Sequence, residues 1–514
     1  MQRKESVNSI DDIDHKERED IVKEDRKDYF WVDVPTLSEN EHKANIKFMK
    51  IRDDLLADGQ MHFLEGYYDS MPVISNSSLF HKLHKMPKGA HLHLHLTAAC
   101  RLDFLMELTK DECIYYNEEK NKLKVFPLGD VEDGYIQTGI LREKWDKEGT
   151  FDEFIKWKIL LNAEDIKSKH SSTIWCNFQH KFNLTFHLYN YSLFFERILF
   201  EIMHDSIKEK VYVMEFRHIF GCVFGKDHKE LNFKDEIAIF DRCLKKAQDI
   251  EPLFTWKIIS CGLKIFGDEQ INSQLKCCME GLEHTNLIAG FDLVCEEDIT
   301  PPLKNYRRMI RTAQEKIEPP LNVFLHAGES CCRFNENLYD AIMLGTKRIG
   351  HGFAILNHPH LMDLAKERDI CLEVCPVSNL VLGYTFDLRW HPARALMHNG
   401  VPLTISADDP GFWNTFGVTL DYAYATLAWE LTLKEMKQFA INGIKYAALT
   451  DEEKEKVIII PYFFYFLWFS FFLFLYSWEK NSIRTGKNGL KILLKKNKDG
   501  NKNKIQVIMS LEVR

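Results

Sequence analysis

Apolar residues recur along this chain with two different periods, and the periods predict which segments are helices and which are strands. Residues 37–85 place apolar side chains three and four positions apart, the spacing of amphipathic helices. Further on, short apolar runs alternate with helical segments. We expect eight strands, at 91–96, 211–216, 254–260, 287–294, 323–326, 348–351, 371–375 and 402–406. Eight strand–helix units predict an α/β fold, a TIM-type (β/α)8 barrel with insertions.

The same pattern divides the chain into regions. Residues 1–36 are expected to be disordered, because 17 of the first 28 residues are charged. Residues 37–85 predict a helical N-terminal extension that packs on the barrel or on a second copy. The barrel itself is expected over residues 86–456. Within it, residues 100–170 form an insertion after the first strand, since they are mixed, charged and rich in turn signals.

An uncharged apolar segment, residues 457–478, differs from everything before it. Its 22 residues include seven Phe and no charged side chain, and about 20 apolar residues suffice to span a bilayer. Residues 479–514 follow with ten Lys and Arg against three acids, which would place this basic tail in the cytosol. Three interpretations stay open for 457–478: a transmembrane span, a buried helix, or translated non-coding sequence in an incorrect gene model.

Composition narrows the class of protein. A net charge of −9 argues against a general nucleic-acid-binding protein, which carries a basic face. The thirteen cysteines include no C-x-x-C pair, so we expect mostly reduced, buried thiols. No apolar stretch near the amino end has the form of a secretory signal, which leaves the localisation open.

Histidine alternates with leucine in the first predicted strand, His91-Leu92-His93-Leu94-His95-Leu96. A period of two places all three imidazoles on one face of the strand. A bound metal explains this face economically, because H-x-H is a common spacing of metal ligands. The alternative is a histidine-rich strand exposed on the surface.

Further ionisable residues stand where later strands end. His326 and Glu329 follow the fifth strand, His351 ends the sixth, and Asp408 follows the eighth. The carboxyl ends of barrel strands meet at one mouth, and the first and eighth strands are neighbours after closure. Three imidazoles and one carboxylate suit Zn²⁺. A second ion would need a bridging residue such as a lysine at the end of the fourth strand, and no lysine stands there. A single ion is therefore favoured. Glu329 and His351 are candidates for the acid and base of a hydrolase.

Five motifs in this order resemble the adenosine deaminase superfamily: MPKG followed by H-x-H, then FLHAGE, RIGHGF, EVCPVSN and ISADDP. The run GFDLV-x-x-ED at 290–298 and the long segments before and after the first strand resemble the adenosine deaminase-related growth factors in particular. The similarity extends from about residue 37 to 456. It implies a homodimer formed through the N-terminal helices, and a secreted protein.

The resemblance also implies residue roles. One Zn²⁺ per chain would be held by His93, His95, His326 and Asp408. The spacing from Lys88 selects His93 and His95 rather than His91, and these two lie nearer the active end of the strand. Glu329 would protonate the purine at nitrogen 1, while His351 would orient and deprotonate the attacking water. Attack at carbon 6 would convert adenosine, and 2′-deoxyadenosine, to the inosine product and ammonia.

Four further positions are implied to contact the substrate. Asp409 would hold nitrogen 7, and Trp175 matches the aromatic residue beside the substrate. Two positions depart from the pattern of the relatives. Thr97 replaces an aspartate that contacts the ribose, and Cys295 replaces a glycine whose backbone N–H meets the purine. Both departures predict weaker or altered nucleoside recognition with the catalytic groups intact.

Two other functions remain as alternatives. The first is a growth-factor or binding protein that keeps the barrel without turnover, against which the presence of Glu329, His351 and Asp408 argues. The second is a deaminase of another aminopurine or of a nucleotide. A nucleotide such as AMP is disfavoured, because no dense Lys/Arg cluster stands near the predicted strand ends.

Overall fold

A computed structural model describes residues 16–21, 24, 37–57, 66–145, 149–168 and 170–454, together with the backbone of residues 488–499 and 502–513. The segment 457–478 and most of residues 1–36 lie outside the described residues, so their predictions are not tested. Over the described residues, no helix is both long enough and apolar enough to cross a bilayer. The described part after residue 487 is an antiparallel strand pair, β12 (Asn488–Asp499) and β13 (Lys502–Val513).

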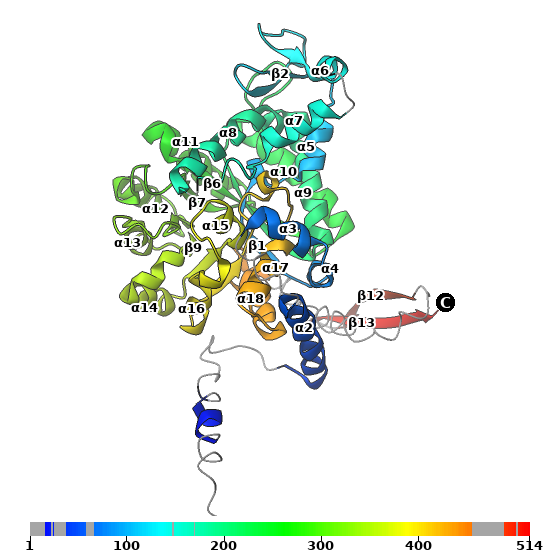
Figure 1. The fold of residues 1–514 in the computed structure, drawn as a ribbon, viewed down its shortest axis with the longest axis vertical. Helices are drawn as coiled ribbons and strands as arrows, with labels where there is room; N and C mark the ends of the chain where they lie inside the picture. Colours follow the sequence, from blue (N-terminus) through cyan, green and yellow to red (C-terminus); the bar gives the residue numbers. More distant parts are fainter. Residues whose placement is uncertain are drawn as a thin grey trace, which may run out of the picture.

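The central barrel consists of two four-stranded parallel half-sheets (Figure 1). The first half-sheet has the order β1-β5-β6-β7 and contains β1 (Gly89–His95), β5 (Val211–His218), β6 (Thr255–Leu263) and β7 (Ile288–Val294). The second has the order β11-β10-β9-β8 and contains β8 (His326–Ala327), β9 (Arg348–His351), β10 (Cys371–Val374) and β11 (Leu403–Ile405). These strands correspond to the eight predicted from the apolar runs.

Hydrogen bonds across two seams join the half-sheets into a closed ring. At one seam Asp408 donates its backbone N–H to the carbonyl of His93 (3.1 Å) and accepts from the N–H of His95 (3.0 Å). At the other seam Phe291 accepts from the N–H of Phe324 (3.0 Å) and forms a parallel bridge with Val323. The predicted TIM-type barrel is therefore confirmed.

Helices surround the barrel, as Figure 1 shows. Local sequence signals set their boundaries. Asn232 caps the helix that begins at Phe233 by accepting from the N–H of Asp235. Thr432 and Glu435 form a capping box at the helix that begins at Leu433. The helices that follow the insertion are α8 (Ser171–Asn190), α9 (Ser192–Lys208), α10 (Phe233–Ile250), α11 (Gly267–His284), α12 (Arg307–Gln314), α13 (Asn337–Met343), α14 (Pro359–Glu367), α15 (Pro376–Val381), α16 (Ala393–His398), α17 (Thr419–Ala428) and α18 (Leu433–Tyr446).

The N-terminal extension is helical and packs on the barrel of its own chain. It comprises α2 (Glu39–Ala57), α3 (Tyr67–Ser75) and α4 (Ser78–His84), and α2 contacts α18 and α17. Phe48 is fully buried in this contact, and Glu41 accepts a 2.7 Å bond from the ammonium of Lys437. Arg52 donates to the carbonyl of Leu431 at 3.0 Å. The extension is thus part of the fold that supports the barrel.

The insertion after β1 has a small sheet of its own, which the irregular sequence pattern did not predict. Its strands are antiparallel in the order β3-β2-β4, namely β2 (Ile114–Asn117), β3 (Lys122–Val125) and β4 (Ile136–Gln137). Helices α5 (Leu102–Leu108), α6 (Thr138–Lys144) and α7 (Thr150–Ile159) accompany it. In Figure 1 this sheet and α6 lie at one end of the molecule, beyond α7.

Candidate active site

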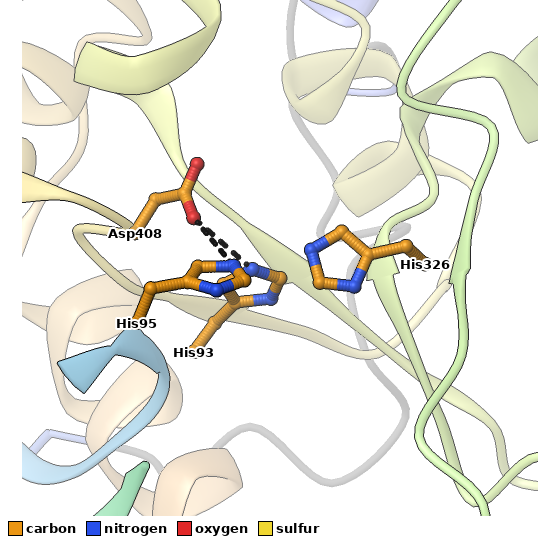
Figure 2. A group of neighbouring side chains, drawn as sticks. All are labelled: His93, His95, His326 and Asp408. Atoms are coloured by element: carbon orange, nitrogen blue, oxygen red, sulfur yellow. Dashed lines mark ion pairs between the residues drawn. The ribbon is translucent and has the colours of Figure 1, made fainter. Parts of the chain in front are cut away.

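Four side chains converge at the carboxyl ends of the barrel strands (Figure 2). His93 and His95 come from β1, His326 from β8, and Asp408 from the residues after β11. One nitrogen or oxygen atom of each lies within 4.8 Å of the others. Oδ1 of Asp408 is 3.3 Å from Nε2 of His93 and 3.2 Å from Nε2 of His95. These four side chains, called the ligand group below, therefore come from both half-sheets.

His91, the first histidine of β1, is not part of this group. It is fully buried, and its Nε2 accepts the backbone N–H of Ala407 at 3.0 Å. Burial lowers the pKa of His91 to about 4, so the imidazole is neutral and can act as this acceptor. The alternation that suggests three equivalent histidines therefore contains one structural histidine and two candidate ligands.

Two buried carboxylates orient the ligand rings. Nδ1 of His93 is 2.8 Å from Glu373, and Nδ1 of His326 is 2.7 Å from Asp292, which leaves the Nε2 of each ring for the centre. Arg217 bridges the two carboxylates, with bonds of 3.0 Å to Asp292 and 2.6 Å to Glu373. Although burial alone would raise it, the pKa of Asp292 falls to about 2 because His326 and Arg217 stabilise its charge.

The sequence pattern does not predict the network of charges that supports these rings. Glu373 also accepts from Nε of Arg348 at 2.5 Å, and Arg348 in turn pairs with Glu215. All of these side chains are buried inside the barrel. The sequence does contain a signal for this network, a single charged residue within an apolar strand, as in the runs FDLV and CLEV. Such a residue indicates a buried partner, because an unpaired charge at such a position would be costly.

The residues present fit a metal ion. Nε2 of His93 and Oδ1 of Asp408 are buried and have no hydrogen-bond partner among the described residues. Buried polar atoms are rarely left unpaired, so such atoms that converge on one point indicate an ion between them. Ser378 donates to Oδ2 of Asp408 at 2.7 Å and so directs Oδ1 towards the histidines. This is a metal-ion site.

Other groupings of potential ligands fit a metal less well. Cys375 lies near His93 and His351, but His93 already belongs to the four converging side chains. On α9, Asp205 clusters with Glu201 and a histidine. There the guanidinium of Arg101 already pairs with both carboxylates.

Glu329 and His351 lie side by side next to the ligand group. Nε2 of His351 is 3.4 Å from Oε1 of Glu329 and 3.9 Å from Oδ2 of Asp408. Burial, reinforced by the charge of Asp408, raises the pKa of Glu329 well above its usual range. Burial and the neighbouring His93 lower the pKa of His351 well below its usual range. The pair therefore offers a protonated carboxyl and a neutral imidazole, one proton donor and one acceptor.

Glu297, in the loop after β7, holds the segment that carries Glu329. Its carboxylate accepts the backbone N–H of Gly328 at 3.0 Å and that of Glu329 at 3.4 Å. Asn335 also donates to this carboxylate from the far end of the same segment. Asp298 accepts from the hydroxyl of Ser330 at 2.7 Å. The ED of the GFDLV-x-x-ED run thus positions the proton donor.

A cavity of about 380 Å³ opens above the ligand group and is lined by nine of the ten predicted site residues, all except His93. Among them, Asp409 is buried, and burial together with the adjacent Asp408 raises its pKa well above the usual range. Trp175, on α8, donates from its indole to the hydroxyl of Tyr384 at 2.7 Å. Thr97 lines the cavity from the short helix η2 (Leu96–Ala98).

The backbone at Cys295 has the conformation of a glycine position. Its φ of 98° lies in a region that residues with a Cβ rarely adopt. The thiol is accommodated against the backbone N–H groups of Ile265 and Lys264. Asp408 and His351 also have positive φ, at 64° and 59°. Strained residues of this kind gather at functional sites, where the surrounding structure holds them.

Comparison with known proteins identifies the barrel. Residues 160–459, more than half of the chain, match the family model described as adenosine deaminase. The chain belongs to the adenosine deaminase family. It is accordingly an enzyme, a hydrolase of the adenosine deaminase type. The matched range contains His326, Glu329, His351 and Asp408, whereas β1 with His93 precedes it.

Curated relatives extend the similarity over most of the chain. Adenosine deaminase 2-A of Danio rerio is 28% identical over 442 residues, covering 82% of this chain and 88% of its own length. Adenosine deaminase 2 of Dictyostelium discoideum is 27% identical and covers 86% and 84%. An adenosine deaminase of Lutzomyia longipalpis is 29% identical and covers 81% and 84%. These names confirm the subgroup expected from the motifs.

Solved structures share the fold at low identity. Arabidopsis ADAL in complex with GMP superposes with a TM-score of 0.56 at 18% identity, covering 74% of this chain and 97% of its own. An amidohydrolase from Burkhoderia ambifaria with bound Zn gives a TM-score of 0.55 at 18% identity, covering 76% and 94%. Both likenesses support the barrel assignment.

Proposed function

We propose that this chain catalyses the zinc-dependent hydrolytic deamination of adenosine and 2′-deoxyadenosine to the corresponding inosine and ammonia. One observation carries the proposal: a convergent three-histidine, one-aspartate group stands beside a proton donor and a proton acceptor at the floor of one cavity. Family membership supports the same reaction.

In this proposal His93, His95, His326 and Asp408 hold one Zn²⁺ per chain. When bound, Zn²⁺ acts as a Lewis acid that lowers the pKa of water and makes it a nucleophile near neutral pH. A single ion is favoured, because Asp292 on β7 is already engaged by His326 and Arg217. No lysine stands at that strand end to bridge a second ion.

Glu329 and His351 move the protons of the reaction. The protonated carboxyl of Glu329 donates to nitrogen 1 of the purine, which makes carbon 6 more electrophilic. The neutral imidazole of His351 orients the attacking water and accepts its proton. A carbon–oxygen bond forms at carbon 6, and His351 passes the proton that it accepted to the amino nitrogen. The carbon–nitrogen bond then breaks and ammonia leaves, while the remaining hydroxyl proton returns to Glu329. One water is consumed for each inosine and ammonia formed.

The remaining predicted residues hold the nucleoside. Asp409 has a raised pKa, and its neutral carboxyl can donate to nitrogen 7, an acceptor. Cys295 keeps a glycine-like backbone conformation, and in this proposal its N–H meets the purine. Trp175 stands beside the substrate. Thr97 offers a neutral hydroxyl near the ribose, which makes that contact weaker than an aspartate would.

Ammonia release by the zinc-loaded protein tests this function, with adenosine, 2′-deoxyadenosine and AMP compared side by side. We expect both nucleosides to be deaminated and AMP to react poorly. Purified Glu329→Gln protein with the same metal content serves as the control for contaminating activity. Saturable binding of adenosine without ammonia release would instead support the growth-factor or binding alternative. Ammonia release from another aminopurine, and not from adenosine, would support the second alternative, a deaminase of that aminopurine.

A further inference from the structure

The cavity extends beyond the metal centre into a part lined by apolar side chains. We call this the outer cavity; it is formed by Phe178, Phe182 and Phe186 of α8 together with Leu263, Ile265 and Phe266 at the end of β6 and in the short helix η3 (Lys264–Phe266). The three phenylalanines are four residues apart and so share one face of α8. Two walls from distant parts of the sequence thus face one space.

Three of these side chains remain open to solvent at the cavity mouth. Phe186 is 39% exposed, Ile265 is 49% exposed and Phe266 is 65% exposed. Scattered exposed apolar residues are ordinary, whereas several gathered at the mouth of a binding cavity mark a surface that a ligand covers. Gln179 and Asn183 interrupt the α8 wall with neutral amides that can meet ribose hydroxyls.

The outer cavity lacks a charge for a phosphate. Among the described residues that line the whole cavity, Arg217 is the one lysine or arginine. Its guanidinium is fully committed, since it bonds to Asp292, Glu373 and the carbonyl of Leu92. Arg217 is also buried beneath the metal ligands. A phosphorylated nucleoside would therefore bring two negative charges to an apolar, unpaired surface.

The proposed reaction fixes which end of the substrate reaches this surface. Carbon 6 and nitrogen 7 of the purine face the metal centre and Asp409, so nitrogen 9 and its sugar point away from them. In the inference drawn here, the 5′ carbon extends into the outer cavity. This step rests on the proposed function.

We propose that the outer cavity selects adenosine nucleosides with an apolar 5′ substituent, the class represented by 5′-alkylthio-5′-deoxyadenosines. Burying two methylene-sized groups against the outer cavity raises kcat/KM roughly tenfold over the same nucleoside without them, at about 0.8 kcal/mol for each group. The 5′ hydroxyl of adenosine gains no such contact. These nucleosides differ from nucleotides because their 5′ substituent carries no charge. They differ from adenosine because that substituent adds apolar surface.

Steady-state kinetics of the zinc-loaded full chain test the proposal with adenosine, 5′-deoxy-5′-methylthioadenosine and AMP. We expect kcat/KM for the methylthio nucleoside to exceed that for adenosine roughly tenfold, and both to exceed that for AMP at least a hundredfold. Phe266→Ser should lower the ratio of methylthio nucleoside to adenosine about fivefold. Ile250→Ser, at an exposed apolar position on α10 outside the cavity, should leave this ratio unchanged.

The outcomes separate this inference from the function on which it rests. Efficient deamination of adenosine, with a kcat/KM for the methylthio nucleoside no higher than that for adenosine, would overturn the inference and leave the proposed function intact. An unchanged ratio in Phe266→Ser would likewise remove the outer cavity as its cause. No ammonia from either nucleoside, with zinc bound and the fold intact by circular dichroism, would refute the proposed function itself.

Discussion

At the scale of single residues, Glu329 shows how the surroundings assign a chemical role. Its carboxyl is buried beside Asp408 and Glu297, and an ionised form would place like charges together. In the proposed reaction, this retained proton is the one that Glu329 donates to the purine. Glu297 acts on Glu329 in two ways. Its charge helps to raise the pKa of Glu329, and its carboxylate accepts the backbone N–H groups that fix the position of Glu329.

Glu329→Gln tests this role directly. The amide keeps the shape of the side chain and removes the transferable proton, so kcat should fall by about 10²–10⁴-fold. Metal content and thermal unfolding should match the parent, because Glu329 is not among the four converging ligands. The measurement is ammonia release with elemental analysis of the same sample. A kcat within threefold of the parent would show that another group donates the proton.

Thr97 tests the nucleoside end of the cavity. Thr97→Asp should lower KM for adenosine more than tenfold, because a charge-assisted hydrogen bond to a ribose hydroxyl contributes roughly 1.5–3 kcal/mol. Thr97→Asn is the matched control, since its neutral amide contributes about 0.5–1.5 kcal/mol and should change KM less. If KM for adenosine is the same in all three proteins, Thr97 does not face the sugar.

At the scale of elements, β1 carries three histidines whose uses differ by register. Period two places them on one face, but only His93 and His95 lie near enough to the carboxyl end to meet His326 and Asp408. His91 lies two residues before His93, and its imidazole accepts the backbone N–H of Ala407, after β11. A shift of two residues along β1 would exchange these roles.

Paired substitutions on β1 measure that register. His93→Ala should abolish zinc binding, because it removes a ligand that Glu373 holds in place. His91→Gln should retain zinc, since its side-chain oxygen can still accept the N–H of Ala407. Elemental analysis after dialysis against a weak chelator gives the comparison. Zinc lost from His91→Gln and kept by His93→Ala would mean that the register is wrong by two.

How much the sequence predicts depends on the element. Buried strands such as Val211–His218 begin with apolar runs that the sequence pattern predicts. Strand-end residues such as His351 are predicted because the ends of barrel strands share one mouth. The strands of the insertion were missed, because Lys122–Val125 alternates charge with apolar residues over only four positions. Asp292 and Glu373 were missed as partners, because their roles depend on neighbours distant in sequence.

At the scale of the whole molecule, the candidate metal site lies across a junction. His93 and His95 belong to the half-sheet of β1, β5, β6 and β7, while His326 and Asp408 belong to the other. Near the site, the seam between β1 and the residues after β11 contains the two backbone hydrogen bonds of Asp408 and the bond from the N–H of Ala407 to His91. An ion bound there would join both halves of the barrel and satisfy buried atoms that have no partner in the described part of the chain.

Removal of the metal should therefore weaken the barrel as well as stop the reaction. An ion that binds only the folded chain adds about 4.1 kcal/mol to the free energy of unfolding when its free concentration is a thousand times its Kd. Chelation should lower the unfolding temperature by several degrees, and one equivalent of Zn²⁺ should restore it. His95→Ala, which removes one of the converging ligands, is the control and should unfold at the same temperature with and without Zn²⁺. If the chelated protein has lost its metal by elemental analysis yet unfolds at the original temperature, the ion does not hold the half-sheets together.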